Sequence, residues 1–264
     1  MGMIMSNRIM KTLLATALAM VVTSVNAEKL PDPLVIATEG AYPPFNYVDS
    51  DGNVKGFEID LANAMCDELN ANCEFVTQDW DGIIPGLLAR KYDAVIGSLY
   101  ITEDRKKKIT FSDKYYQTPA RFVVPSDSDI EITDEGLSSL TVGTQRGTSF
   151  ERMMRDQHPD VDLRVYGSFD EVYQDLVTGR VDVVIDDVVS AKDNLLSRER
   201  GEAYELRGPE FTNPEWFGHG AGVAVRHEDA HIAEAFSEAI AAIREDGTYQ
   251  EIADEWFGFD VYGE

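Results

Sequence analysis

Two segments of this chain carry the same pattern of residues. Residues 87–98 read LLARKYDAVIGS, and residues 176–187 read LVTGRVDVVIDD. In each segment an apolar helix end is followed by a basic turn, an acidic residue and a short run rich in β-branched residues. Such a run is typical of a strand that is buried on both faces, as in a parallel sheet covered by helices. The repeat therefore predicts two similar α/β units.

Both predicted strands end at polar residues, which are Gly97-Ser98 in the first unit and Asp186-Asp187 in the second. In open α/β sheets, ligands bind just beyond the carboxyl ends of the strands. Two units that each present polar groups at such an end are suited to close on one small molecule. We therefore expect a two-lobed α/β protein with its ligand cleft between the lobes.

The rest of the chain also alternates between strand-like and helical patterns. A strand is predicted at Leu34–Thr38, and the closing helices at His231–Arg244 and Tyr249–Trp256. Residues 112–119 show no clear helical period, and the Gly/Thr/Ser-rich segment 143–149 predicts a loop. No low-complexity tract separates the halves, so we expect short connections between closely coupled lobes.

The first 27 residues have the pattern of a secretory signal peptide. Arg8 and Lys11 form a basic region, Leu13–Val22 carries no charge, and Val25-Asn26-Ala27 is a small-residue cleavage site. An uncleaved membrane anchor is the alternative, but about ten strongly apolar residues are too few to span a bilayer. We therefore expect export to the periplasm, without a lipid anchor because no cysteine follows Ala27 directly.

The two cysteines, Cys66 and Cys73, both lie in the exported part of the chain. An oxidising compartment favours a disulfide, which here would close a short local loop. Two ligands at this spacing, with no histidine near them, do not make a metal site. The pair is predicted to be a structural disulfide.

Acidic residues far outnumber basic ones, with 48 Asp and Glu against 23 Lys and Arg and a formal net charge of −25. Such a surface is a poor partner for nucleic acids and anionic lipids. The acids are scattered through almost every segment, which indicates a solvated surface suited to saline surroundings. Attraction for cationic solutes would be a secondary effect.

Residues 227–231 match the H-E-x-x-H motif of zinc proteases. That chemistry needs a motif inside a rigid helix and a third ligand. Here the motif stands at a predicted helix start, just after the strand-like Ala221–Val225, and only His158 and His219 remain as histidine ligands. We therefore expect no catalytic metal.

The stretch Gly97–Arg105 follows a buried strand and offers hydroxyls, backbone N–H groups and one arginine. A guanidinium matches the geometry of a carboxylate, so this stretch is a candidate carboxylate site. The alternative is a surface helix start that is capped by Thr102.

A set of motifs occurs in the order and spacing of a known family. The motifs are Gly40–Phe45, Gly56–Ala62, Trp80–Pro85, Ser98 with Ile101–Arg105, Phe111–Tyr116, Gly143–Thr148 and Asp246–Tyr249. Together they resemble the solute-binding proteins of polar amino acid ABC importers, in particular the lysine/arginine/ornithine- and histidine-binding branch. The resemblance covers nearly all of the chain after residue 27.

This resemblance implies the type II periplasmic binding protein fold. Lobe 1 is expected to comprise residues 28–117 and 219–264, and lobe 2 residues 118–218, joined by two crossovers. Hinge closure of such lobes buries the ligand and presents a surface to a membrane permease.

The resemblance also implies how the ligand's α-groups are held. Arg105 is expected to clamp the α-carboxylate, helped by Ser98 and by backbone donors around Gly147 and Ser149. Asp187 is expected to receive the α-ammonium group.

The ligand side chain is expected to lie between Tyr42 and Trp80, since aromatic faces suit an aliphatic stem with a cationic tip. Glu39 falls where this branch carries an acid that meets the distal positive charge. Tyr100 and Trp80 depart from residues that relatives often carry and change the size of the pocket, which leaves open which cation fits.

The resulting expectation is a monomeric binding component of an ABC importer, without cofactor or catalysis, that takes arginine, lysine, ornithine or histidine and works with an inner-membrane permease. An opine or another polar amino acid is an alternative ligand. A dehydratase-like enzyme on the same fold is a further alternative, although every matched polar group has a ligand-gripping role. A receptor sensor domain is a third class, against which the lack of a transmembrane segment counts.

Overall fold

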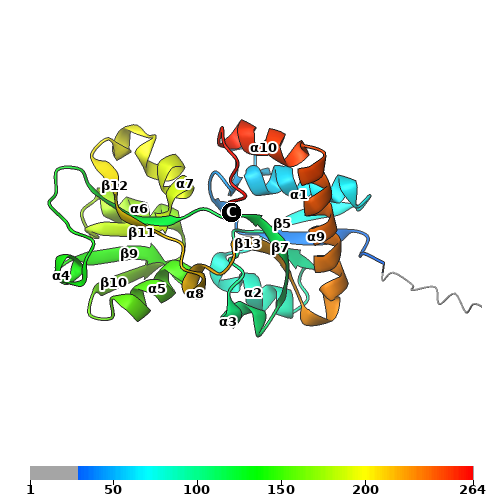
Figure 1. Cartoon of the computed structure of the whole chain (residues 1–264), viewed down its shortest axis with the longest axis horizontal. Coiled ribbons are helices and arrows are strands. Elements are labelled where there is room, and N and C mark those ends of the chain that lie inside the picture. Colours follow the sequence, from blue (N-terminus) through cyan, green and yellow to red (C-terminus); the bar gives the residue numbers. More distant parts are fainter. Residues whose placement is uncertain (1–28, 264) are drawn as a thin grey trace, which may run out of the picture.

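Two lobes lie side by side in the computed structural model, which describes residues 29–263 (Figure 1). Each lobe is built on a five-stranded sheet with helices packed against it. The signal peptide predicted for residues 1–27 lies outside the described residues. Among residues 29–263, no helix has the length and apolar character needed to cross a membrane.

The first sheet has the strand order β5-β1-β6-β13-β7. Its strands are β1 (Leu34–Thr38), β5 (Cys73–Thr77), β6 (Ala94–Val95), β7 (Thr110–Tyr116) and β13 (Ala221–Val225). Strands β5, β1 and β6 run parallel, and β13 pairs antiparallel with both β6 and β7. This lobe also holds the small sheet of β2 (Ala41–Tyr42), β3 (Asn46–Val48) and β4 (Val54–Lys55), and the helices α1 (Phe57–Glu68), α2 (Trp80–Leu88), α3 (Glu103–Lys106), α9 (Ala230–Glu245) and α10 (Thr248–Trp256).

The second sheet has the order β10-β9-β11-β8-β12. Its strands are β8 (Ala120–Pro125), β9 (Thr141–Gln145), β10 (Asp162–Tyr166), β11 (Val183–Asp187) and β12 (Tyr204–Phe211). Its helices are α4 (Asp134–Leu137), α5 (Ser149–Gln157), α6 (Phe169–Val177), α7 (Val188–Ala191), which continues as a π-helix at Lys192–Leu196, and α8 (Pro214–Phe217).

The two sheets share one arrangement. In each, three parallel strands are followed by a fourth that pairs antiparallel with the third, and by a fifth that pairs antiparallel with the fourth. Strand β6 after α2 and strand β11 after α6 are third in their sheets, and they contain the residues of the sequence repeat. The predicted pair of equivalent α/β units is confirmed.

Three segments differ from the sequence-based expectations. Strand β9 continues to Gln145, inside the predicted Gly/Thr/Ser loop. Strands β7 and β12 were not predicted, because each is an edge strand with exposed polar residues that interrupt its apolar pattern.

The chain passes between the sheets twice, once between β7 and β8 and once between β12 and β13. At the second passage Gly218 has a φ of 56°. A Cβ atom there would lie 1.9 Å from the carbonyl oxygen of Ile101, so only glycine lets the chain approach the segment that leads to Arg105. The lobe boundaries at 117/118 and 218/219 stay predictions.

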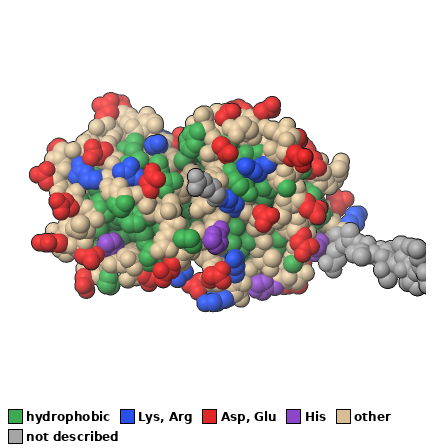
Figure 2. Space-filling model, in the orientation of Figure 1, with side chains coloured by type: hydrophobic (Ala, Val, Ile, Leu, Met, Phe, Trp, Pro, Cys, Tyr) green, Lys and Arg blue, Asp and Glu red, His purple; other side chains and the backbone are tan. Residues whose placement is uncertain are grey.

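The predicted disulfide between Cys66 and Cys73 is present and links the last turns of α1 to the first residue of β5. Acidic side chains are spread over both lobes on the face shown in Figure 2, with no single acidic patch.

Candidate ligand-binding cleft

A narrow cavity lies between the lobes. From the first lobe it is lined by Glu39, Tyr42, Trp80, Gly97, Ser98, Tyr100, Arg105 and Tyr116, and from the second by Gln145, Thr148, Ser149, Phe150 and Phe169. Most of the predicted ligand-binding residues are in this set, whereas Gly147 and Asp187 are not. The cavity holds about 20 Å³ of free space, roughly the room that one water molecule needs. An amino acid therefore requires the cleft to open.

Arg105 lies in the short helix α3, whose N-cap Thr102 accepts a hydrogen bond from the Arg105 backbone N–H. Its Nη1 donates to the carbonyl of Tyr100 at 3.0 Å, and its Nη2 to the carbonyl of Gly147 at 3.4 Å. Burial lowers the pKa of Arg105 to about 10, so the guanidinium stays charged at neutral pH. Its Cζ lies 5.6 Å from the Trp80 ring centroid. Within residues 29–263 these neutral groups hold the guanidinium, and no carboxylate pairs with it.

The buried carboxylate of Glu58 holds Ser98 in place. Its backbone N–H and its hydroxyl both donate to Glu58 Oε1, at 2.5 and 3.1 Å. Tyr115 and Asn46 also donate to the Glu58 carboxylate, at 2.5 and 2.7 Å. Ser98 has a φ of 54°, a conformation that non-glycine residues rarely adopt, and these bonds hold it there.

Helix α5 begins beside Arg105. Thr148 caps it by accepting from the Glu151 N–H, and the Gly147 N–H donates to the Glu151 carboxylate at 2.6 Å. The Gly147 amide is thus occupied within the helix cap. Ser149, the first residue of α5, lines the cavity. The first backbone N–H groups of a helix have no partner within the helix, so an anion is favoured at this end.

Glu39 also lines the cavity and is 9% exposed. The Gln145 amide donates to Glu39 Oε1 at 2.6 Å and to the Gly167 carbonyl at 2.9 Å. Burial raises the pKa of Glu39 to about 7, the Gln145 bond opposes this shift, and the nearby acids Glu58, Asp79 and Asp81 add to it. A cation beside this carboxylate would offset both the desolvation cost of the carboxylate and its repulsion by the nearby acids.

Asp187 is fully buried at the end of β11 and is the N-cap of α7. Its Oδ1 accepts from the backbone N–H groups of Val189 and Ser190, at 2.7 and 3.2 Å. Its Oδ2 accepts from the hydroxyls of Thr118 and, at 3.4 Å, Tyr100. Burial raises the pKa of Asp187 to about 6.

Asp186, the preceding residue, is equally buried and accepts hydrogen bonds from Tyr42, Tyr173 and Ser190 at 2.7–2.8 Å. Burial, and then the charge of Asp187, raise its pKa to about 8. The hydrogen bond from Tyr42 in the first lobe to Asp186 in the second joins the two lobes directly.

Residues 34–259 match the family of bacterial extracellular solute-binding proteins, family 3. The chain belongs to this family. The L-arginine-binding protein of Pseudomonas aeruginosa is 39% identical to it over 96% of this chain and 98% of that protein. The histidine-binding periplasmic protein of Escherichia coli is 37% identical over 96% and 99% of the two chains. A solved ancestral arginine-binding protein bound to arginine is 34% identical, covers 87% of this chain and 100% of its own, and has a TM-score of 0.80.

The predicted family and the predicted type II binding-protein fold are therefore confirmed, while the roles of single residues stay predictions. In this solute-binding protein the sequence predicted Asp186 only as a polar strand end, and Glu58 and Gln145 were not predicted as parts of the site. Glu58 lies in the motif Gly56–Ala62, which indicated the family but not a role for Glu58 in the site. Gln145 lies in the motif Gly143–Thr148 in the same way, but its pairing with Glu39 gave no signal, because Glu39 is far away in sequence and in the other lobe.

The histidine motif lies outside the cleft. His227 begins a short 3₁₀ turn before α9, and its Nδ1 lies 2.9 Å from the Thr110 hydroxyl. Within residues 29–263 no group of three His, Cys, Asp or Glu side chains is placed to hold a metal ion.

Proposed function

We propose that this protein is the periplasmic substrate-binding component of an ABC importer and that its ligand is a basic L-amino acid. One observation carries the proposal. A guanidinium without a carboxylate partner, Arg105, and a buried carboxylate without a cationic partner, Glu39, face the same cavity of the described chain. A molecule with an anionic end and a cationic end supplies both counter-charges.

In the proposed complex the ligand carboxylate lies between Arg105 and the first amides of α5 at Ser149. The aliphatic stem lies against Tyr42 and Trp80, and the distal cation meets Glu39. The arginine- and histidine-binding names of the relatives support this class of ligand. We assign no catalytic role to these groups, since the relatives named above are binding proteins.

We also propose the cellular location and the membrane partner that the family implies. The signal peptide at residues 1–27 would deliver the chain to the periplasm. Closure of residues 118–218 on residues 28–117 and 219–264 would produce the form that an inner-membrane permease receives, with the protein acting as a monomer.

A thermal-shift screen of the mature protein against cationic, neutral and acidic amino acids tests this function. Arginine, lysine, ornithine or histidine should raise the melting temperature, because a ligand that binds only the folded state stabilises it. Octopine tests the opine alternative in the same plate. A larger shift with glutamine or glutamate than with every basic amino acid would contradict the cationic class.

A further inference from the structure

Gly97 lines the cavity, although neither its backbone nor its packing requires a glycine. Its φ is not in the left-handed region, so a side chain would not strain the chain there. A Cβ atom would lie 3.6 Å from Ile83 Cδ1 and 3.7 Å from both Thr38 Oγ1 and the Glu39 backbone nitrogen, which are ordinary contact distances. The cavity wall therefore has an open place, the size of a small side chain, beside Glu39.

The hydroxyl of Thr38 borders this open place and has no hydrogen-bond partner within residues 29–263. Thr38 is the last residue of β1 and is completely buried. A buried hydroxyl without a partner costs free energy, and most such groups in proteins are paired. The buried hydroxyl of Thr144 in β9, for example, donates to the Ile185 carbonyl at 3.1 Å. The Thr38 hydroxyl thus offers a hydrogen bond that a bound molecule can complete.

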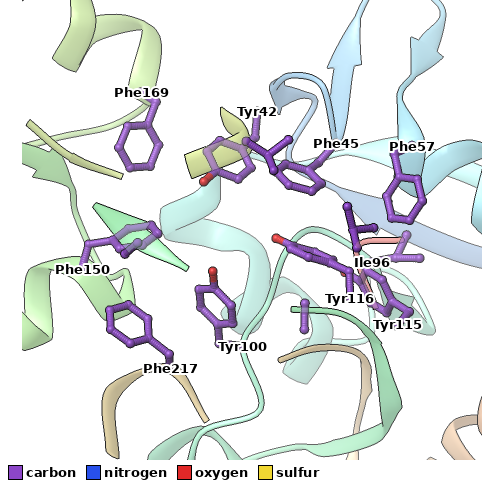
Figure 3. Packing of buried hydrophobic residues seen from close by; sticks show 14 of the residues in the cluster. Tyr42, Phe45, Phe57, Ile96, Tyr100, Tyr115, Tyr116, Phe150, Phe169 and Phe217 are labelled. Carbon is purple, nitrogen blue, oxygen red and sulfur yellow. The ribbon is translucent and has the colours of Figure 1, made fainter. Parts of the chain in front are cut away.

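All of these groups belong to the first lobe, so opening of the cleft leaves them together. The Ile96 N–H donates to the Ala37 carbonyl, and the Gln78 N–H to the Thr38 carbonyl, both at 2.9 Å. The Ile96 side chain also belongs to the buried cluster that Figure 3 shows. The open place beside Gly97 is therefore already formed when a ligand enters.

The side-chain ends of arginine and lysine differ in the partners they need. A guanidinium group is planar and carries five N–H donors in a fixed fork, whereas an ammonium group is compact and carries three. A guanidinium with one terminal nitrogen at the Glu39 carboxylate has a second terminal nitrogen to place nearby. An ammonium group at Glu39 has no such second nitrogen and would leave the Thr38 hydroxyl unpaired.

We propose that Gly97 and Thr38 form a subsite for the second terminal nitrogen of a guanidinium group, so that this pocket prefers arginine to lysine and ornithine. Gly97 provides the room, and Thr38 Oγ1 accepts the hydrogen bond. The inference rests on the proposed function, in which Glu39 meets the distal cation of the ligand, and it narrows the ligand class to guanidinium compounds.

Titration calorimetry on the mature protein with arginine, lysine, ornithine and glutamine tests this preference. The wild type should bind arginine about tenfold or more tightly than lysine and ornithine, the factor that a hydrogen bond to a charged group supplies. Lysine that binds as tightly as arginine overturns the inference and leaves the proposed function intact. Glutamine that binds more tightly than all three cations overturns both.

Thr38→Val removes the hydroxyl and keeps the shape of the side chain. It should weaken arginine by about tenfold and change lysine by less than about twofold. The melting temperature of the empty protein should not fall, because the variant loses an unpaired buried hydroxyl. A hydroxyl with only a structural role would leave the ratio of arginine to lysine affinity unchanged, and that result overturns the assignment. Thr38→Ser retains the hydroxyl and should retain the arginine preference.

Gly97→Ala tests the open place, and Thr144→Val is the matched control. The added methyl group should weaken arginine by about tenfold, a cost typical of overpacking, and weaken lysine less. Thr144→Val removes a paired hydroxyl in the second lobe, so it should lower the melting temperature and leave the affinity ratio unchanged. If Thr38→Val does not fold, the wild type and Gly97→Ala decide, and an unchanged ratio in Gly97→Ala overturns the inference.

Discussion

At the scale of single residues, Arg105 and Glu39 carry the proposed function. Each is desolvated, and each meets no opposite charge within residues 29–263. Such groups are costly to bury alone, so binding should depend on them far more than on their exposed neighbours.

Arg105→Ala should abolish detectable binding of basic amino acids while the protein stays folded. Truncating one partner of a buried charge pair costs about 2–5 kcal/mol, because the ligand carboxylate is left without a donor. Lys106→Ala is the matched control, since Lys106 lies next to Arg105 in α3 but is exposed and pairs with Glu103. Calorimetry on both variants decides, and near-normal affinity of Arg105→Ala would end the carboxylate-clamp assignment.

Glu39→Gln should weaken arginine and lysine by about 1.5–3 kcal/mol, the value of a hydrogen bond to a charged group, and affect glutamine little. The pKa of Glu39 is raised by burial to about 7, so the carboxyl becomes neutral as the pH falls through 7. Wild-type affinity for arginine should therefore drop between pH 8 and pH 6, where arginine itself stays charged. In Glu39→Gln this pH dependence should vanish. Competition titrations at pH 6, 7 and 8 measure the affinity for arginine. If the affinity of Glu39→Gln still drops as the pH falls, a group other than Glu39 takes up the proton.

At the scale of elements, the strand ends and helix starts set which groups face the ligand. Asp187 caps α7, and the hydroxyl of Tyr100 from the first lobe donates to its Oδ2. The contact of Asp187 with the ligand's α-ammonium group stays a prediction.

Asp187→Asn separates these two roles, because asparagine is an equally good N-cap and only the charge is lost. Arginine should lose much more affinity than 5-guanidinopentanoate, which lacks the α-nitrogen. Equal weakening of both ligands would mean that Asp187 supports the second lobe and does not contact the ligand.

The disulfide belongs to this scale too, since it links α1 to the edge strand β5. Replacing Cys66 and Cys73 together by alanine should lower the free energy of unfolding by about 2–3 kcal/mol and leave ligand preference unchanged. Urea denaturation and a ligand panel measure the two effects. A changed ligand preference would show that α1, which carries Glu58 beneath Ser98, moves when the bridge is lost.

Much of the fold was predictable because central strands are buried on both faces and their apolar runs stand out, as at β6 and β11. Edge strands such as β12 expose one side and leave no such run. In the site, Arg105 lies in a family motif and Glu39 directly precedes one. The hydrogen bonds that Asp187 accepts from Tyr100 and Thr118 join residues far apart in the chain, which spacing in sequence does not reveal.

At the scale of the whole molecule, function depends on the balance between open and closed lobes. The cavity is too small for an amino acid to enter, so the lobes must part and close again. Contacts between the lobes outside the cavity, such as the Asn194 amide donating to the Pro43 carbonyl at 2.9 Å, favour the closed arrangement.

Two exposed ion pairs across the cleft make this balance sensitive to salt. Arg146 pairs with Asp81 at 2.7 Å, and Arg152 with Asp104 at 2.9 Å. Exposed pairs contribute about 0–1 kcal/mol each and are screened by salt. Without ligand, the radius of gyration from X-ray scattering should rise between 50 mM and 1 M NaCl as closed molecules open, and saturating arginine should suppress the rise. In the double variant Asp81→Asn, Asp104→Asn the radius should already be larger at low salt and respond less. An identical radius in all of these conditions would mean that the ion pairs do not influence closure.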